Sequence, residues 1–125
     1  MAEKPETTFK RRIRPQLEAL PKTWVVKVQQ VATVGTPDFL LCVNGRFVAL
    51  ELKAHEKAKI AKIQSYVLER ISHSAGIALV VFPENWQSVF GFLKGLANGE
   101  KNDLDSVPIF PGTSLLKCPR ETGSA

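Results

Sequence analysis

The sequence is poor in cysteine and has no long apolar run, and each absence excludes a class of protein. Its two cysteines, Cys42 and Cys118, lie far apart in the 125-residue chain and lack the spacing of metal ligands. This excludes a disulfide scaffold and a zinc ribbon, and is typical of a reducing compartment. No apolar run approaches the roughly 18–20 residues that cross a bilayer, and residues 1–5 lack the apolar stretch of a secretory signal. We therefore expect a cytoplasmic or nucleoid-associated protein of a bacterial or phage-infected cell, not a secreted one.

The composition predicts one globular, basic domain. Hydrophobic residues make up 44% of the chain and charged residues 23%, which suffices for one core. The net charge is +5, and it belongs to the first seventy residues, because residues 71–125 carry four basic and five acidic side chains. The basic residues form two clusters, the first being Lys10, Arg11, Arg12 and Arg14, and the second Lys57, Lys59 and Lys62. Such a balance indicates a polyanionic partner, although each cluster alone is also typical of a solvated helix face.

Hydrophobic periodicity predicts an α/β chain with the order α-β-β-β-α-β-α. Pro15 is expected to kink or interrupt the first helix, and Gly76 to cap the second. Trp24, Cys42 and Trp86 fit apolar patterns and are expected in the core. We expect helices over 6–20 and 58–74 and a third that begins at Trp86 and closes near Gly99, and strands over 24–31, 39–43, 47–52 and 77–82.

The connections between these elements predict a mixed sheet. Asn44-Gly45 lies between two apolar runs and predicts a two-residue hairpin turn of type I′, which needs positive φ at both positions. A hairpin followed by a helical crossover to another strand implies a mixed sheet with helices on its faces. We assign residues 1–97 to this domain and 98–125, which contain three prolines, to a partly irregular C-terminal extension. Val107 to Phe110 in that extension is a candidate interface.

Two carboxylates and a lysine are expected at the open end of the hairpin. Glu51 and Lys53 are two residues apart on one strand, so their side chains share a face. Counting outward from the turn pairs Phe39 with Leu50 and places Asp38 opposite Glu51, with Cβ atoms about 4.5–5.5 Å apart. Two facing carboxylates repel one another, but a divalent cation between them inverts that repulsion. An isolated Glu–Lys pair on a wet sheet face is the alternative interpretation.

Oxygen ligands of this kind favour Mg²⁺ or Mn²⁺ over zinc. A Mg²⁺ held by one or two carboxylates keeps several waters and commonly bridges to phosphate. Lys53 adds a cation that can hold an attacking water or stabilise charge on a pentavalent phosphorus. Asp38, Glu51 and Lys53 thus predict phosphodiester hydrolysis.

These residues resemble the PD-(D/E)XK nuclease signature. Gly35-Thr36-Pro37-Asp38 is followed across the hairpin by Glu51-Leu52-Lys53. The finer resemblance is to the VRR-NUC branch, the virus-type replication and repair nucleases. It rests on the Gly-x-Pro-Asp loop, the stretch from Asn44 to Ala49, Glu-x-Lys, a helical Gln64 and Gly76-Ile77-Ala78. The resemblance covers about residues 6–82 and implies a restriction-endonuclease-like fold.

The resemblance also implies roles for individual residues. Asp38, Glu51 and the backbone carbonyl of Leu52 would bind Mg²⁺, for which Mn²⁺ would substitute. Lys53 would act on the water and the scissile phosphate, and Gln64 would complete the catalytic site. Glu6 would be the helical acid that helps to bind the metal, with Glu3 as a nearby competitor. His55 lies just after Lys53 and would contact phosphate beside the two basic clusters.

The leading functional hypothesis is therefore a metal-dependent DNA endonuclease that selects DNA by shape. No helix-turn-helix or zinc finger is visible in the sequence. Small stand-alone members of the family look like homodimeric nucleases that act on branched DNA, including Holliday junctions, in replication, recombination or repair. One alternative is a homing or restriction-like enzyme that cleaves duplex DNA at a sequence. The other is a non-catalytic nucleic-acid-binding subunit, which the intact Asp38, Glu51 and Lys53 disfavour.

Overall fold

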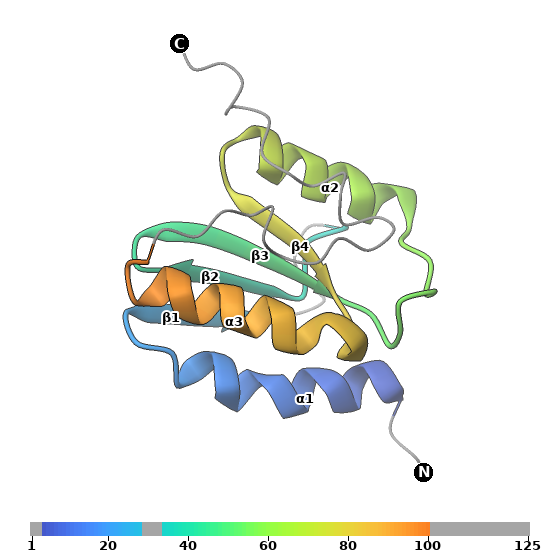
Figure 1. The fold of residues 1–125 in the computed structure, drawn as a ribbon. Helices are drawn as coiled ribbons and strands as arrows, with labels where there is room; N and C mark the ends of the chain where they lie inside the picture. Colours follow the sequence, from blue (N-terminus) through green and yellow to red (C-terminus); the bar gives the residue numbers. More distant parts are fainter. Residues whose placement is uncertain (1–3, 29–33, 101–125) are drawn as a thin grey trace.

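The computed structural model describes residues 4–28 and 34–100, and these form an α/β fold with the predicted order of elements (Figure 1). The predicted interface at Val107 to Phe110 and most of the predicted extension lie outside the described residues. No helix in the described part of the chain is long and apolar enough to cross a membrane. The elements are α1 (Pro5–Glu18), β1 (Thr23–Lys27), β2 (Phe39–Val43), β3 (Arg46–Leu52), α2 (Lys62–His73), β4 (Ile77–Val81), a short 3-10 helix η1 (Pro83–Asn85) and α3 (Trp86–Ala97).

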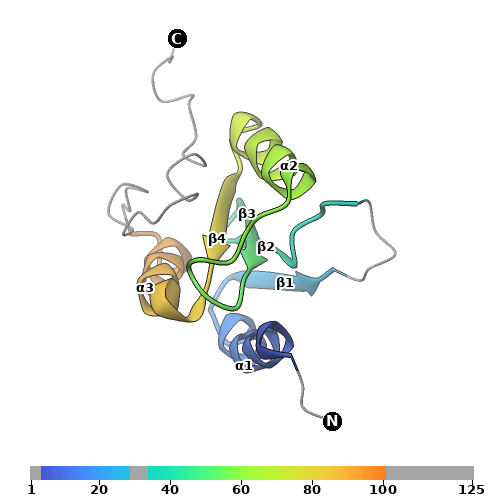
Figure 2. The ribbon, with the colours of Figure 1, turned by 90° about the vertical axis from the view of Figure 1, so that its right-hand side faces the viewer.

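The four strands form one mixed sheet in the order β1-β2-β3-β4. β1 pairs with β2 and β2 with β3 in antiparallel fashion, whereas β3 and β4 are parallel. A parallel pair needs a long crossover, and α2 provides it. Helices α1 and α3 lie on one face of the sheet and α2 on the other (Figures 1 and 2).

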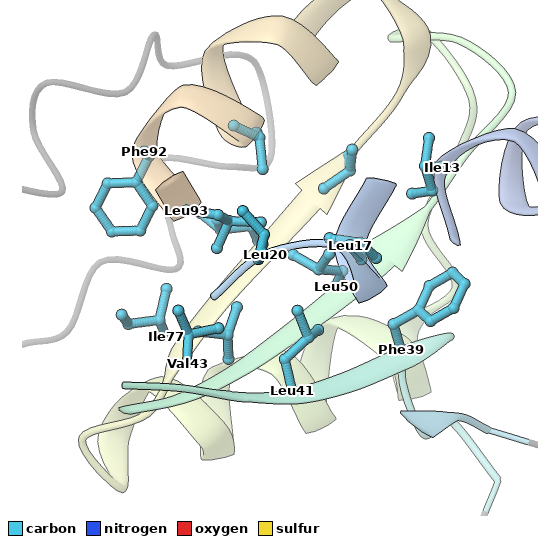
Figure 3. Close-up of a cluster of buried hydrophobic side chains, with 14 of the residues drawn as sticks. Ile13, Leu17, Leu20, Phe39, Leu41, Val43, Leu50, Ile77, Phe92 and Leu93 are labelled. Atoms are coloured by element: carbon cyan, nitrogen blue, oxygen red, sulfur yellow. The ribbon is translucent and has the colours of Figure 1, made fainter. Parts of the chain in front are cut away.

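The main core lies between the sheet and the pair of helices α1 and α3 (Figure 3). Successive strand residues point to opposite faces, so Leu50 and Leu52 of β3 enter this core while Glu51 between them faces α2. A smaller cluster under α2 consists of Leu68, Ala78, Val80 and Phe82. Because α2 and β4 cover this side of β3, Glu51 is only 1% exposed.

Two predicted features of the helices are wrong. α1 continues through Pro15, because Phe9, Ile13 and Leu17 keep one face buried against the core along the whole helix. α2 begins at Lys62 and not near residue 58, because the Gln64 side chain accepts a hydrogen bond from the Ala61 N–H (3.0 Å) and fixes the first turn there. The segment from 53 to 61 is therefore a loop, and it carries Lys57 and Lys59.

The hairpin turn is confirmed, whereas the cap of α2 differs from the prediction. Asn44 and Gly45 have φ values of 50° and 86°, as a type I′ turn requires. After α2 the left-handed residue is Ala75, with φ of 72°, and not Gly76. A Cβ on Gly76 would lie 2.9 Å from Cγ2 of Ile71 and 3.0 Å from a Phe47 ring carbon. Glycine is needed there for close packing and not for its φ.

Of the three residues expected in the core, only Trp86 is buried. Trp24 is 67% exposed and Cys42 is also exposed. Trp24 pairs with Cys42, and Cys42 pairs with Phe47, so the three form one row across the sheet. This row lies on the face away from α1 and α3, beyond the part that α2 covers, since α2 packs mainly on β4.

Candidate active site

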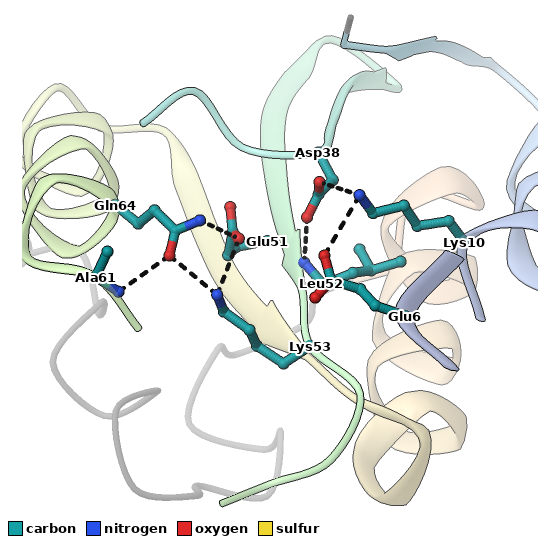
Figure 4. A network of polar contacts seen from close by, with 8 residues as sticks. All are labelled: Glu6, Lys10, Asp38, Glu51, Leu52, Lys53, Ala61 and Gln64. Atoms are coloured by element: carbon teal, nitrogen blue, oxygen red, sulfur yellow. Dashed lines mark hydrogen bonds and ion pairs between the residues drawn. The ribbon is translucent and has the colours of Figure 1, made fainter. Parts of the chain in front are cut away.

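Asp38, Glu51, Lys53 and Gln64 lie together where β2 begins, β3 ends and α2 begins (Figure 4). The loop before Asp38 is held against α2 at Gly35, which has φ of 88°. A Cβ at Gly35 would lie 2.8 Å from Cγ1 of Ile63, so only glycine permits this approach. The packing of this loop sets the direction from which Asp38 enters the site.

Asp38 is fixed by hydrogen bonds on both its backbone and its side chain. Its carbonyl oxygen accepts from the Val28 N–H (2.9 Å) and its Oδ2 from the Leu52 N–H (2.8 Å). The strand register is confirmed from the turn up to the pair Phe39–Leu50. The ladder stops there, one step short of the expected Asp38–Glu51 pair, because the Asp38 side chain binds the backbone of β3 at Leu52.

Gln64 joins Glu51 to Lys53. Its Nε2 donates to Oε2 of Glu51 (2.9 Å), and its Oε1 accepts from Nζ of Lys53 (2.9 Å). Lys53 Nζ also lies 3.5 Å from the same Glu51 oxygen. Because Gln64 Oε1 additionally accepts from the Ala61 N–H, the amide is held by the first turn of α2. The helix thus orients both the carboxylate and the ammonium group.

Burial perturbs the ionisation of Glu51 strongly. Loss of solvent raises the pKa of Glu51 to about 8, and the nearby charge of Asp38 adds to that increase. The ammonium group of Lys53 lowers the pKa but does not compensate. Oε1 of Glu51 is a buried side-chain oxygen without a hydrogen-bond partner among the described residues. A buried carboxylate with a vacant acceptor is unfavourable by itself.

A divalent cation would fit this carboxylate. It would satisfy Oε1 of Glu51 and favour the ionised form, reversing the effect of burial. Within residues 4–28 and 34–100, no three His, Cys, Asp or Glu side chains gather closely enough to hold a metal. Asp38 and Glu51 offer two carboxylates, and oxygen ligands of this kind suit Mg²⁺ or Mn²⁺, which keep several waters.

Glu6 contacts Lys10, which in turn contacts Asp38. Nζ of Lys10 lies 2.7 Å from Oδ1 of Asp38 and 3.4 Å from Oε2 of Glu6. Burial lowers the pKa of Lys10, but the hydrogen bond to Asp38 and the two acidic charges outweigh it and raise the pKa overall. Lys10 therefore stays charged between the two carboxylates. The sequence interpretation assigned Lys10 to DNA only and missed this contact, although the spacing of four residues after Glu6 on a helix is a usable signal.

The remaining residues of the predicted DNA-binding clusters have different surroundings. Arg12 lies over the Phe9 ring, 5.3 Å from its centroid, and Arg14 pairs with Glu18 at 3.2 Å. A hollow of about 400 Å³ between α1 and β1 is lined by the cationic side chains of Lys10, Arg11, Arg14 and Lys27, together with Glu18, Thr7 and Pro15. We call it the basic groove. The sequence interpretation missed Lys27, which lines this groove. It grouped Arg12 with Lys10, Arg11 and Arg14, but Arg12 does not line the groove.

The second basic cluster lies in the loop before α2 and at the start of that helix. His55, Lys57 and Lys59 are exposed in the loop that links β3 to α2, and Lys62 is exposed at the first residue of α2. This loop follows Lys53 directly. Positive charge therefore occurs in two regions, the groove along α1 and the loop before α2.

A larger hollow, of about 590 Å³, lies between Phe47 and α2. Its walls are mostly apolar, and Tyr66 and Arg70 are among the lining residues. None of its lining residues belongs to the carboxylate cluster. The chemistry of the side chains, and not the size of the hollow, therefore identifies the candidate site.

Comparison with known proteins leaves the site to be interpreted from its own geometry. No family model, no curated protein and no solved structure matches this chain.

Proposed function

We propose that this protein is a Mg²⁺- or Mn²⁺-dependent DNA endonuclease with a restriction-endonuclease-like fold of the VRR-NUC type. The observation that carries the proposal is the buried Glu51 carboxylate, with one vacant oxygen, beside Asp38 and linked through Gln64 to Lys53. Two carboxylates, one of them with a buried oxygen that lacks a hydrogen-bond partner, and an oriented ammonium group are the parts that metal-assisted phosphodiester hydrolysis requires.

Asp38, Glu51 and the Leu52 carbonyl would hold the metal in this proposal. The cation would supply charge that polarises the scissile phosphate and lowers the pKa of a bound water. The Leu52 N–H keeps Asp38 Oδ2 in place, so the carboxylate is oriented before the metal arrives. Glu6 lies one turn before Lys10 on α1 and would join the metal ligands only when Lys10 leaves.

Lys53 would orient the nucleophilic water or stabilise the negative charge that develops on phosphorus. Gln64 restrains its ammonium group at 2.9 Å, so little reorganisation is needed during the reaction. Gln64 is a positioning residue in this proposal, since it acts through Glu51 and Lys53.

The flanking positive charge would bind the phosphates on either side of the scissile bond. The basic groove lies along α1, and Lys57 and Lys59 lie in the loop that follows Lys53. No described element presents a sequence-reading motif to the major groove, which favours recognition of branched DNA. Two symmetric nicks in a Holliday junction would need two such sites related by a two-fold axis, and hence a homodimer.

Cleavage of a panel of labelled DNA shapes tests this proposal. Linear, splayed, flapped and four-way DNA are incubated with the protein in Mg²⁺, Mn²⁺ or EDTA. We expect metal-dependent nicking with preference for branched DNA. Preferential cleavage of linear duplex at one sequence would indicate a restriction-like enzyme, and binding without nicking in either metal would indicate a non-catalytic subunit.

A further inference from the structure

The side chain of Lys10 lies between two carboxylates, one of which is the proposed metal ligand Asp38. Its ammonium group lies 2.7 Å from Oδ1 of Asp38 and 3.4 Å from Oε2 of Glu6. The Asp38 and Lys10 side chains are only 18% and 22% exposed. Solvent therefore screens this contact less than it would screen a surface ion pair.

The other oxygen of Asp38 is already engaged by the Leu52 N–H. A metal that binds Asp38 through Oδ1 meets the Lys10 ammonium group there, and Figure 4 shows this group lying between the Asp38 and Glu6 carboxylates. Two cations cannot share this position, because they repel each other at contact distance. Metal binding at Oδ1 of Asp38 and the Lys10–Asp38 ion pair therefore oppose one another.

The basic groove offers a second partner to the displaced ammonium group. Lys10 is one of its lining residues, and the other cations there are Arg11, Arg14 and Lys27. Glu18 is the acidic side chain in the lining, and Arg14 pairs with it at 3.2 Å. A phosphate in this groove would attract Lys10 away from Asp38, since an ammonium group binds phosphate as a point charge.

We propose that Lys10 is a tethered cation that holds the metal position until a divalent metal displaces it, and that the basic groove is an anion subsite to which it then moves to bind a phosphate of the DNA. The inference rests on the proposed function, because it takes the metal position and the DNA substrate from it. Metal and phosphate then favour one another's binding, and by linkage the effect is reciprocal. The device keeps the carboxylates ordered before the metal binds.

Calorimetric titration with Mn²⁺ in the absence of DNA is the first test. Lys10→Met should bind Mn²⁺ about tenfold more tightly than the wild type, within the roughly 5–150-fold range of coupled sites. Arg14→Met is the matched control, because it removes one positive charge one turn farther along α1 without freeing Asp38. It should change the affinity by less than about threefold. Equal effects of the two variants would overturn the proposal that the metal displaces Lys10 from Asp38.

DNA binding with and without metal is the second test. Fluorescence anisotropy follows a labelled duplex in Mn²⁺ or EDTA, with every variant in a Lys53→Ala background to keep the duplex intact. Lys10→Met should weaken binding mainly in Mn²⁺, because in EDTA the Lys10 ammonium group is held by Asp38. Arg14→Met should weaken binding similarly in both. Equal losses for Lys10→Met in both conditions would overturn the inference.

The two tests separate the inference from the proposed function. Lys10→Gln is the second variant, since it keeps a donor for Asp38 without the charge and should behave as Lys10→Met does. If wild-type protein binds Mn²⁺ and nicks DNA while both Lys10 variants match Arg14→Met, only the role of Lys10 is wrong. If wild-type protein neither binds Mn²⁺ nor nicks DNA, the proposed function is wrong, and the inference with it.

Discussion

Replacement of Glu51 by Gln should remove a pH-dependent loss of stability from the metal-free protein. Folding raises the pKa of Glu51 from 4.5 to about 8, mainly through burial. Between these two values the folded protein binds a proton that the unfolded chain does not. Glu51 therefore makes its full contribution to the free energy of unfolding below pH 4.5. This contribution is lost as the pH rises through 8.

The size of the effect follows from the shift. A single proton changes the free energy of unfolding by at most about 1.4 kcal/mol per pH unit, which over the whole interval gives an upper limit of about 5 kcal/mol. Gln keeps the shape of the protonated side chain and cannot ionise. Glu51→Gln should thus match the wild type near pH 5 and become several kcal/mol more stable toward pH 8.

Urea unfolding in EDTA at pH 5, 6, 7 and 8 measures this difference. All other ionisable groups are present in both proteins, so their contributions cancel in the comparison. Saturating Mn²⁺ should stabilise only the wild type, and more at pH 8 than at pH 5, because the metal binds the ionised carboxylate. A difference between the two proteins that stays constant with pH would refute the reasoning.

Other substitutions test the remaining parts of the site. Lys53→Ala should keep Mn²⁺ affinity but slow single-turnover cleavage by about 10²–10³, as for loss of one oriented donor. Lys53→Arg should restore cleavage poorly, because a planar guanidinium replaces a compact charge. Cleavage by Lys53→Ala within about threefold of the wild type would mean that Lys53 has no catalytic role. Gly35→Ala should destabilise the fold by about 1–3 kcal/mol, whereas Gly91→Ala, at a helical position with open space, should be neutral or stabilising in the same thermal unfolding assay. Replacement of Lys57, Lys59 and Lys62 by Ala should lower the log–log salt slope of DNA binding by about 0.9 per lost phosphate contact. An unchanged slope would mean that these side chains are only solvated.

Local patterns predicted the order of the elements, the hairpin register and the shared face of Glu51 and Lys53, whereas Gln64 was assigned from the family resemblance. The Asn44-Gly45 turn fixes the hairpin register, because each position has the positive φ that a type I′ turn needs. With the register fixed, the strand period of two places Glu51 and Lys53 on one face. The meeting of Gln64 with both of them also agrees with the expected site.

What the sequence did not reveal depends on the packing of distant elements. Trp24 and Cys42 fit an apolar pattern, but α2 covers too little of the sheet to bury them. The contact of Lys10 with Asp38 depends on how α1 crosses the end of the sheet, which periodicity along α1 does not encode. The start of α2 depends on the bond from the Ala61 N–H to Gln64, and a helical pattern alone extends the helix too far toward its N-terminus.

The most direct test of the central claim is the nicking of a labelled four-way junction by wild-type protein, Asp38→Ala and Glu51→Ala, each in Mn²⁺ and in EDTA. Folding of each variant is checked by circular dichroism, and DNA affinity by anisotropy. The account predicts nicking by the wild type in Mn²⁺ alone, and loss of nicking in both variants while the fold and DNA binding persist. Nicking at the wild-type rate by either variant, or by the wild type in EDTA, would contradict it.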